Sequence, residues 1–384
     1  VVYVSQSGDS SILKRYDVIT GSTQTILSTN GTETIQEANI SPDGQWVLLV
    51  ALLQNQLAIQ LVRVDGQQLQ TLYCAPAQMG IDAALLSPNQ HFLVFNQVAD
   101  ENISTLYLLD LTTGQLHTEL SPLQPGYPDL SQAQLQTTAV SVLSSSSFHD
   151  KTTDNLKASS FTPWPSKHYL IYIPMKWANN SVYLLGTVKA TGALPHQLAL
   201  LRDISKDVSQ QGSNLQTITT AFYDECQDYD VTPDNHQLVC SAYTLVGPAT
   251  PSAIKTQPII GDTLHSVYSE PVGGRIVARV LSNSTLIFIL DKPNDPPSLW
   301  KINIDGSGLT QLMTTSTTDM DLGFAYASYL PWLIMSSDGK LYVLSVSNLA
   351  SNAQSLVFGS LSGGTVKTVA SSANSLLLVG WAEV

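Results

Sequence analysis

The chain has 384 residues, of which 12% are charged and 43% are hydrophobic, so it is a folded chain that is unusually poor in charge. Lys and Arg total 17 against 30 Asp and Glu, which gives a net charge of −13 and leaves no basic stripe for a nucleic-acid backbone. The longest apolar runs, such as 46–53 and 286–290, are much shorter than the roughly 20 residues needed to cross a bilayer. We therefore expect neither a nucleic-acid partner nor membrane insertion by this chain.

A Pro-centred turn followed by an apolar strand occurs four times, in ANISPDGQWVLLV, ALLSPNQHFLVFN, SSFTPWPSKHYLIYI and DVTPDNHQLVCSA. In the first copy, Pro42 presets φ, the Asp43 side chain can bond the local backbone, and Gly44 accepts a positive φ. An extended segment precedes this turn, and strands are predicted at 46–53, 56–64 and 68–73. Four short strands joined by tight turns are typical of one β-propeller blade.

Similar units follow at 82–120, 157–201, 216–270, 275–313 and 321–359, with the roughly 40 to 50 residue spacing of propeller blades. In the 157–201 unit, YLIYI is predicted to be the second strand. The termini supply one more blade: 365–381 has the pattern of a first and a second strand, and 1–27 that of strands ending in the Thr20-Gly21 turn. Because 1–6 and 376–381 both fit the second strand, the assignment of each strand in this blade stays open. We predict one all-β domain over 1–384, a β-propeller of four-stranded antiparallel blades. The ring is closed by the two termini and has seven blades, with eight as the alternative.

The segment 121–155 interrupts this period where only a short connection between blades is needed. It is rich in Ser, Thr and Gln and contains Pro122, Pro125 and Pro128. Long connections of this kind lie on a face of the fold and often carry binding residues. A binding loop and a passive loop both remain open.

The repeats resemble the TolB-like, or PD40, class of bacterial β-propeller repeats, which is WD40-like. The turn residues that carry the resemblance are Ser41 to Gly44, Asp65-Gly66, Ser87 to Asn89, Thr113-Gly114, Thr232 to Asn235, Asp305-Gly306 and Ser337 to Gly339. The resemblance covers most of the chain and implies an extracytoplasmic scaffold that binds protein partners. The Trp-Asp dipeptides of strict WD40 blades are absent from the sequence, and we expect no separate N-terminal domain such as TolB carries.

The three cysteines are Cys74, Cys226 and Cys240, without CxxC spacing or a nearby His pattern typical of zinc. Cys226 and Cys240 flank the TPDN turn, and counting outward from it places them almost opposite each other on adjacent strands. This predicts a disulfide between them, with two buried free thiols as the alternative.

No Gly-x-Ser-x-Gly elbow, HExxH motif or phosphate-binding Gly loop occurs in the sequence. The densest cluster of carboxylates is Asp224, Glu225, Asp228, Asp230 and Asp234. Calcium prefers several oxygen ligands in one place, so Asp224, Asp228 and Asp230 are candidate calcium ligands, and a solvated acidic rim is the alternative. We expect no other cofactor.

Trp164 and Trp177, near turns of the blade after the insertion, are candidate contacts with a partner; core packing is the alternative. Together these features favour a non-catalytic scaffold that binds a protein, a peptide or another ligand. We expect a monomeric module of an exported or membrane-anchored bacterial protein, since the chain starts at Val1 without an initiator Met. The alternatives are a metal-assisted enzyme of lactonase or lyase type in the central channel, and an accessory propeller of a hydrolase domain outside this chain.

Overall fold

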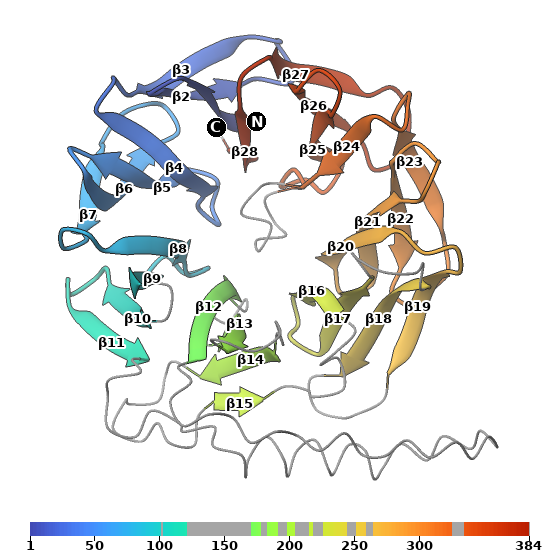
Figure 1. Cartoon of the computed structure of the whole chain (residues 1–384), viewed down its shortest axis with the longest axis horizontal. Helices are drawn as coiled ribbons and strands as arrows, with labels where there is room; N and C mark the ends of the chain where they lie inside the picture. Colours follow the sequence, from blue (N-terminus) through green and yellow to red (C-terminus); the bar gives the residue numbers. More distant parts are fainter. Residues whose placement is uncertain are drawn as a thin grey trace.

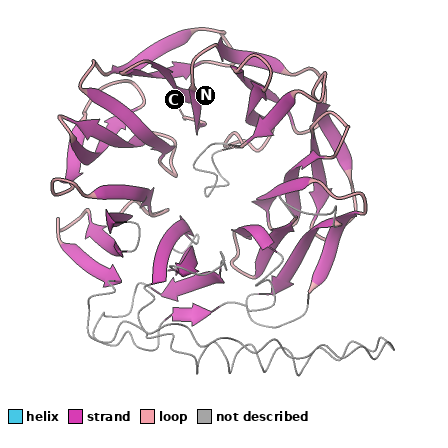
Figure 2. Cartoon of the chain, in the orientation of Figure 1, coloured by secondary structure: helices cyan, strands magenta, loops and turns pink. Residues whose placement is uncertain are grey.

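The computed structural model describes residues 1–100, 103–120, 170–177, 183–190, 198–203, 215–217, 226–243, 251–258, 264–324 and 334–383. These residues form strands and no helix (Figure 2). In the N-terminal half the strands are β1 (Val2–Ser7), β2 (Ser10–Tyr16), β3 (Thr23–Ser28), β4 (Glu33–Ile40), β5 (Trp46–Leu53), β6 (Gln56–Arg63), β7 (Gln70–Cys74), β8 (Gly80–Leu86), β9 (Phe92–Asp100), β10 (Ile103–Asp110), β11 (Leu116–Leu120), β12 (Leu170–Trp177), β13 (Tyr183–Ala190) and β14 (Leu198–Asp203). In the C-terminal half they are β15 (Leu215–Thr217), β16 (Cys226–Val231), β17 (Gln237–Ala242), β18 (Ser252–Pro258), β19 (His265–Glu270), β20 (Arg275–Ser282), β21 (Thr285–Asp291), β22 (Ser298–Asn303), β23 (Thr310–Thr314), β24 (Met320–Gly323), β25 (Leu341–Asn348), β26 (Ala353–Ser360), β27 (Lys367–Ser372) and β28 (Leu376–Gly380).

The described residues form seven four-stranded antiparallel sheets, which stand around a common centre (Figure 1). We number them in chain order: sheet 1 is β28-β1-β2-β3, sheet 2 is β4 to β7, sheet 3 is β8 to β11, and sheet 4 is β12 to β15. Sheet 5 is β16 to β19, sheet 6 is β20 to β23, and sheet 7 is β24 to β27. The first strand of each sheet lies innermost and the fourth lies at the periphery (Figure 1). The expected all-β propeller class is confirmed.

Sheet 1 contains strands from both ends of the chain. The innermost strand β28 pairs with β1, and Leu377 lies opposite Val4. After β28 the chain continues onto sheet 2, where the Glu383 amide donates to the Gly44 carbonyl at 3.0 Å. The prediction that 365–381 supplies two strands of this blade is wrong, because β27 is the outermost strand of sheet 7 and only β28 enters sheet 1.

The predicted strand order of the 157–201 unit also differs from the structure. Residues 170–173 of the segment expected as a second strand lie in β12, which among the described strands pairs with β13 and starts its sheet. An apolar strand next to a Pro-rich turn has the same pattern in either position, so the sequence could not separate the two. The TPWPS turn and the predicted insertion 121–155 lie outside the described residues.

Four turns between an innermost and a second strand share one hydrogen-bond pattern. In the turn of sheet 2, the Ser41 hydroxyl donates to Asp43 Oδ1 at 2.5 Å and accepts from the Trp46 amide at 2.9 Å. Asp43 Oδ1 also accepts from the Gln45 amide at 3.1 Å. The same bonds recur in sheets 3, 5 and 7, around the side-chain pairs Ser87–Asn89, Thr232–Asp234 and Ser336–Asp338. The repeated Ser/Thr and Asp/Asn therefore build the turn, as the sequence indicated.

The Asp-Gly turns between a third and an outermost strand pack against the preceding sheet. Gly66 has φ +85°, and a Cβ there would lie 2.8 Å from the Ile26 carbonyl oxygen of sheet 1. Gly306 has the same φ, and a Cβ would lie 3.0 Å from the Val267 carbonyl oxygen of sheet 5. Glycine is required at these turns for two reasons: the positive φ, and the close approach of a carbonyl oxygen of the preceding sheet.

The hydrophobic core lies between neighbouring sheets rather than within them. One buried cluster joins Leu48 and Val50 of sheet 2 to Leu93 and Phe95 of sheet 3. Corresponding clusters fill the spaces between sheets 5 and 6, 6 and 7, and 7 and 1. In the part of the chain that the structure describes, no helix is long and apolar enough to cross a membrane.

Candidate functional site

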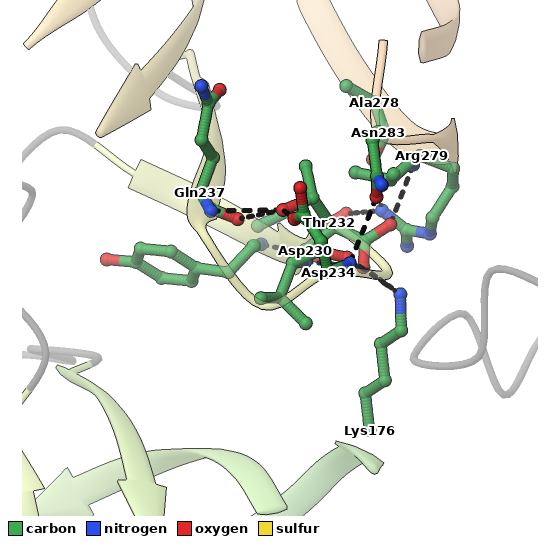
Figure 3. A network of polar contacts seen from close by, with 12 residues as sticks. Lys176, Asp230, Thr232, Asp234, Gln237, Ala278, Arg279 and Asn283 are labelled. Carbon is green, nitrogen blue, oxygen red and sulfur yellow. Dashed lines mark hydrogen bonds and ion pairs between the residues drawn. The ribbon is translucent and has the colours of Figure 1, made fainter. Parts of the chain in front are cut away.

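Buried charged side chains gather where the innermost strands β12, β16 and β20 meet (Figure 3). Lys176 extends from β12 toward sheet 5, and its Nζ donates to Asp230 Oδ1 at 2.9 Å and to the Val231 carbonyl at 3.0 Å. The side chains of Lys176 and Asp230 are 6% and 2% exposed. One buried ion pair therefore connects sheets 4 and 5.

The same cluster continues from sheet 5 into sheets 6 and 7. The second oxygen of Asp230 accepts from the Val280 amide at 2.7 Å. Arg279 Nη1 donates to Asp228 Oδ2 and, at 2.7 Å, to the carbonyl of its neighbour Ala278. The Arg279 guanidinium also lies 5.6 Å from the ring centroid of Phe324 in sheet 7. Four consecutive sheets are thus linked near the centre of the ring.

Burial determines the electrostatics of this cluster. It lowers the pKa of Lys176 and raises the pKa of Asp228, because both charged forms lose contact with water. The Asp230 carboxylate opposes the shift in Lys176, and the Arg279 guanidinium opposes the shift in Asp228. The charges are tolerated because each has a partner, and removal of one partner would leave an uncompensated buried ion.

Sheet 6 holds its neighbours through further cations. Arg275 pairs with Asp321 of sheet 7 and donates to the Leu322 carbonyl at 2.9 Å. Lys301 donates to the Leu361 carbonyl of sheet 7 at 2.9 Å, and Lys292 lies 3.5 Å from Glu270 of sheet 5. In a chain with only 17 Lys and Arg, these cations join sheets to one another.

A second carboxylate pair lies on the innermost strands of sheets 2 and 3. The pKa of Glu37 on β4 is raised to about 7, mainly because the side chain is partly buried. Repulsion from the carboxylate of Asp82 on β8 is the second, smaller cause. Asn39 of the same strand donates to the Ala84 carbonyl of β8 at 3.3 Å, which holds the two strands together. A carboxyl group with this pKa can take up or release a proton near neutral pH.

The structure places two of the three predicted calcium ligands together. Asp228 and Asp230 are 13% and 2% exposed and pair with Arg279 and Lys176, so the alternative of a solvated acidic rim is wrong for them. Asp224 lies outside the described residues, and calcium binding stays a prediction. Among the described residues, no group of three or more His, Cys, Asp and Glu could hold a metal ion.

The cysteine and tryptophan predictions have different outcomes. Cys74 is an exposed free thiol and Cys240 is disulfide-bonded. The side chain of Cys226 lies outside the described residues, so its pairing with Cys240 stays a prediction.

The prediction that Trp177 is an exposed contact with a partner is wrong, because Trp177 is 0% exposed and its Nε1 donates to the Leu85 carbonyl of sheet 3 at 3.2 Å. Trp164 lies outside the described residues.

Sequence reasoning missed Lys176, Arg279 and Glu37. Lys176 and Asp230 are 54 residues apart, and Arg279 and Asp228 are 51 residues apart. A usable signal was present, because a charged residue inside an otherwise apolar innermost strand of a charge-poor chain requires a buried partner.

No protein-family model matches the chain, and no curated protein matches it. Solved structures do match. The chain is similar to a prolyl endopeptidase with a TM-score of 0.57 and 9% identity, over 88% of this chain and 43% of that chain. The chain therefore spans less than half of the length of that protein.

Two further structures match at low identity. The β-propeller domain of the Trilobed protease from Pyrococcus furiosus matches with a TM-score of 0.51 and 10% identity, over 88% of this chain and 85% of that chain. TolB from Acinetobacter baumannii matches with a TM-score of 0.45 and 12% identity, over 82% of this chain and 63% of that chain. The matches to the prolyl endopeptidase and to the propeller domain of the Trilobed protease show a β-propeller fold, and the family resemblance of the repeats stays a prediction.

Proposed function

We propose that this propeller is a non-catalytic scaffold that binds a protein or peptide partner. The observation that carries the proposal is the use of the central charges: Lys176, Asp228, Asp230 and Arg279 pair with one another across sheets. Charged groups that pair with one another in this way connect neighbouring sheets and are not free to act on a substrate. Binding then falls to the turns and connections at the ends of the sheets, which is where propellers and other rigid scaffolds carry recognition residues.

We further propose that the protein works outside the cytoplasm, as a monomer. The disulfide at Cys240 supports this compartment, because disulfides persist in oxidising environments and are rare in reducing ones.

The test is site-specific photo-crosslinking in the source cells, with a photoreactive amino acid introduced at exposed positions around the ring. Discrete protein adducts at neighbouring positions are expected. In parallel, the purified full chain is assayed with divalent cations against lactones, uronate oligosaccharides and peptides. Turnover that is lost in Glu37→Gln would overturn the proposal in favour of an enzyme, because Glu37 is the described carboxyl with a pKa of about 7.

A second candidate is an accessory propeller of a peptidase. The match to a prolyl endopeptidase favours it, since this chain corresponds to 43% of that protein. The sequence of the complete polypeptide separates the two: a Gly-x-Ser-x-Gly segment in a flanking domain would support the accessory role. Peptidase activity of the complete polypeptide that is lost when the Ser of that segment is replaced would establish it.

A further inference from the structure

Most of the exposed large apolar side chains in the described part of the chain lie at the same end of their sheets. Of seven such residues in the described part of the chain, five lie at the connection between a third and an outermost strand. They are Ile19, Leu69, Leu116, Leu264 and Leu309, which are 92%, 46%, 42%, 41% and 45% exposed. The other two, Val272 and Leu349, lie at the opposite end, in an outermost-to-innermost connection and a second-to-third turn.

The topology places those five residues on one face of the ring. Each sheet is an antiparallel meander, so its first and third connections emerge at the same end and its second connection emerges at the other. The face with the first and third connections, called here the turn face, therefore carries the Ser/Thr–Asp/Asn turns, the Asp-Gly turns and the five apolar residues. The sheets surround one centre, so these positions are distributed around the ring (Figure 1).

Two of the leucines are held in equivalent places by the fold. Leu69 follows Gly66 by three residues and Leu309 follows Gly306 by three residues. Each glycine packs on a carbonyl of the preceding sheet, which fixes the turn and leaves the leucine in solvent. Leu264 and Leu116 likewise stand immediately before or at the start of an outermost strand. An exposed apolar residue therefore recurs at this place in five of the seven sheets, namely sheets 1, 2, 3, 5 and 6.

The turn face is also acidic. Its described residues include seven aspartates: Asp17, Asp65, Asp110 and Asp305 at the outer connections, and Asp43, Asp234 and Asp338 at the inner turns. Hydrogen bonds within the turns keep several of them ionised; the Thr112 hydroxyl and amide lower the pKa of Asp110 to about 2. Among the described residues of this face, ion pairs involve only Asp65, Asp234 and Asp338, with Arg63, His236 and Lys340.

We propose that the turn face binds a protein partner that presents basic and apolar side chains on one surface. This inference rests on the proposed scaffold function and adds the face and the chemistry of the partner. Apolar contacts with the recurring leucines supply affinity, and the ionised aspartates steer and orient a basic partner. An anionic lipid surface or a nucleic acid would be repelled by the same carboxylates.

The test uses a defined probe, a fluorescently labelled 16-residue peptide of four Leu-Lys-Lys-Leu repeats, titrated with the purified full chain at 150 mM NaCl. Two comparison peptides separate the contributions: Leu-Glu-Glu-Leu repeats lack the positive charge, and Ser-Lys-Lys-Ser repeats lack the apolar side chains. We expect binding of the first peptide, and at least tenfold weaker binding of the other two, equivalent to about 1.4 kcal/mol.

Matched variants locate the binding face. The double variant Ile19→Ser/Leu69→Ser, in the neighbouring sheets 1 and 2, should weaken binding of the Leu-Lys-Lys-Leu peptide by about tenfold. The variant Val272→Ser/Leu349→Ser removes as much exposed apolar surface from the opposite face and should bind like the unaltered chain. The triple variant Asp17→Asn/Asp110→Asn/Asp305→Asn keeps an acceptor oxygen in each turn, as Asn89 does in sheet 3, and should weaken binding and reduce its dependence on salt.

Equal loss of binding in both serine variants, or no loss in either, would overturn the assignment of the turn face. Absence of binding to the Leu-Lys-Lys-Leu peptide would also overturn it. Neither result would contradict the proposed scaffold function. Photo-crosslinking at positions outside the turn face tests that function independently. Thermal melts of every variant confirm that the folded population is unchanged before binding is compared.

Discussion

Lys176 Nζ lies 2.9 Å from Asp230 Oδ1 and joins the innermost strands of two neighbouring sheets in a nearly water-free place. Asp230 also accepts from the Val280 amide of the next sheet, so one carboxylate connects three sheets. The chain thus places a rare cation where removal of either partner leaves a buried charge without compensation.

The first prediction concerns this pair. We expect Lys176→Met to destabilise the fold by about 3–5 kcal/mol, because the Asp230 carboxylate stays buried without its cation. Urea unfolding followed by tryptophan fluorescence measures the change. Lys340→Met is the control: Lys340 pairs with Asp338 at 2.9 Å, but the two side chains are 76% and 52% exposed. Its effect should be within about 0.5 kcal/mol.

The double variant Lys176→Met/Asp230→Leu checks the reasoning behind that number. Because both charges are removed together, its cost should be smaller than the sum of the two single variants. Additive costs would mean that the two side chains do not interact in solution.

The second prediction concerns the packing of Gly66 on sheet 1. Gly66→Ala introduces a Cβ 2.8 Å from the Ile26 carbonyl oxygen at φ +85°, so both sterics and backbone strain oppose it. Gly114 has φ +72° in the corresponding turn of sheet 3, with nothing within 4 Å of its Cβ position. Gly114→Ala should cost about 1–2 kcal/mol from strain alone. Gly66→Ala should cost about 1–3 kcal/mol more. Equal losses of stability in Gly66→Ala and Gly114→Ala would show that sheet 1 shifts to make room for the added Cβ.

Much of the fold follows from local chemistry that the sequence displays. The turn at Ser41 to Gly44 is built by side chains within a few residues, so its motif predicts its structure. The ring follows from repetition of that unit. The order of the strands in sheet 1 could not be predicted, because 1–6 and 376–381 both fit the pattern of a second strand and pairing across the termini decides it.

The charged cluster was less accessible to sequence reasoning. Asp228 and Asp230 were recognised as a concentration of carboxylates, but a metal and a protein cation satisfy carboxylates equally well. Which of them does so depends on Lys176 and Arg279, which lie more than 50 residues away in opposite directions along the chain. Whether these two side chains reach the carboxylates depends on how the sheets pack against one another, and no local sequence pattern indicates this packing.

The third prediction concerns pH and Glu37. Its pKa is about 7 in the folded chain and 4.5 in the unfolded one. The folded state therefore binds more protons between these values, and the stabilising contribution is complete below 4.5 and is lost as pH rises through 7. Glu37→Gln should stabilise the chain at pH 8 by about 1–3 kcal/mol and have little effect at pH 4.5.

Chemical denaturation at several pH values measures the effect of Glu37→Gln. Asp82→Asn serves as a second variant, because removal of its charge should lower the Glu37 pKa and shift the transition to lower pH. A Glu37→Gln effect that is the same at pH 4.5 and pH 8 would contradict the raised pKa.

The fourth prediction concerns calcium. Calcium at Asp228 and Asp230 would have to displace Arg279 and Lys176 from their carboxylates. We expect millimolar CaCl2 to change the Tm of the unaltered chain by less than about 1 °C, because an ion that does not bind the folded state cannot stabilise it. A rise of several degrees that is lost in Asp228→Asn would instead establish the calcium site predicted from the sequence.

The fifth prediction concerns the disulfide at Cys240. With Cys74 free and Cys240 bonded to Cys226, the unfolded but unreduced chain should show one titratable thiol. Cys226→Ser should then expose a second thiol and destabilise the fold by about 3 kcal/mol, since the bond closes a short loop around the Thr232 turn. Cys74→Ser, at an exposed position, is the control and should leave stability unchanged while it removes the single reactive thiol. Three thiols in the unaltered chain would contradict the pairing, and they would also remove the support that this bond gives to an oxidising compartment.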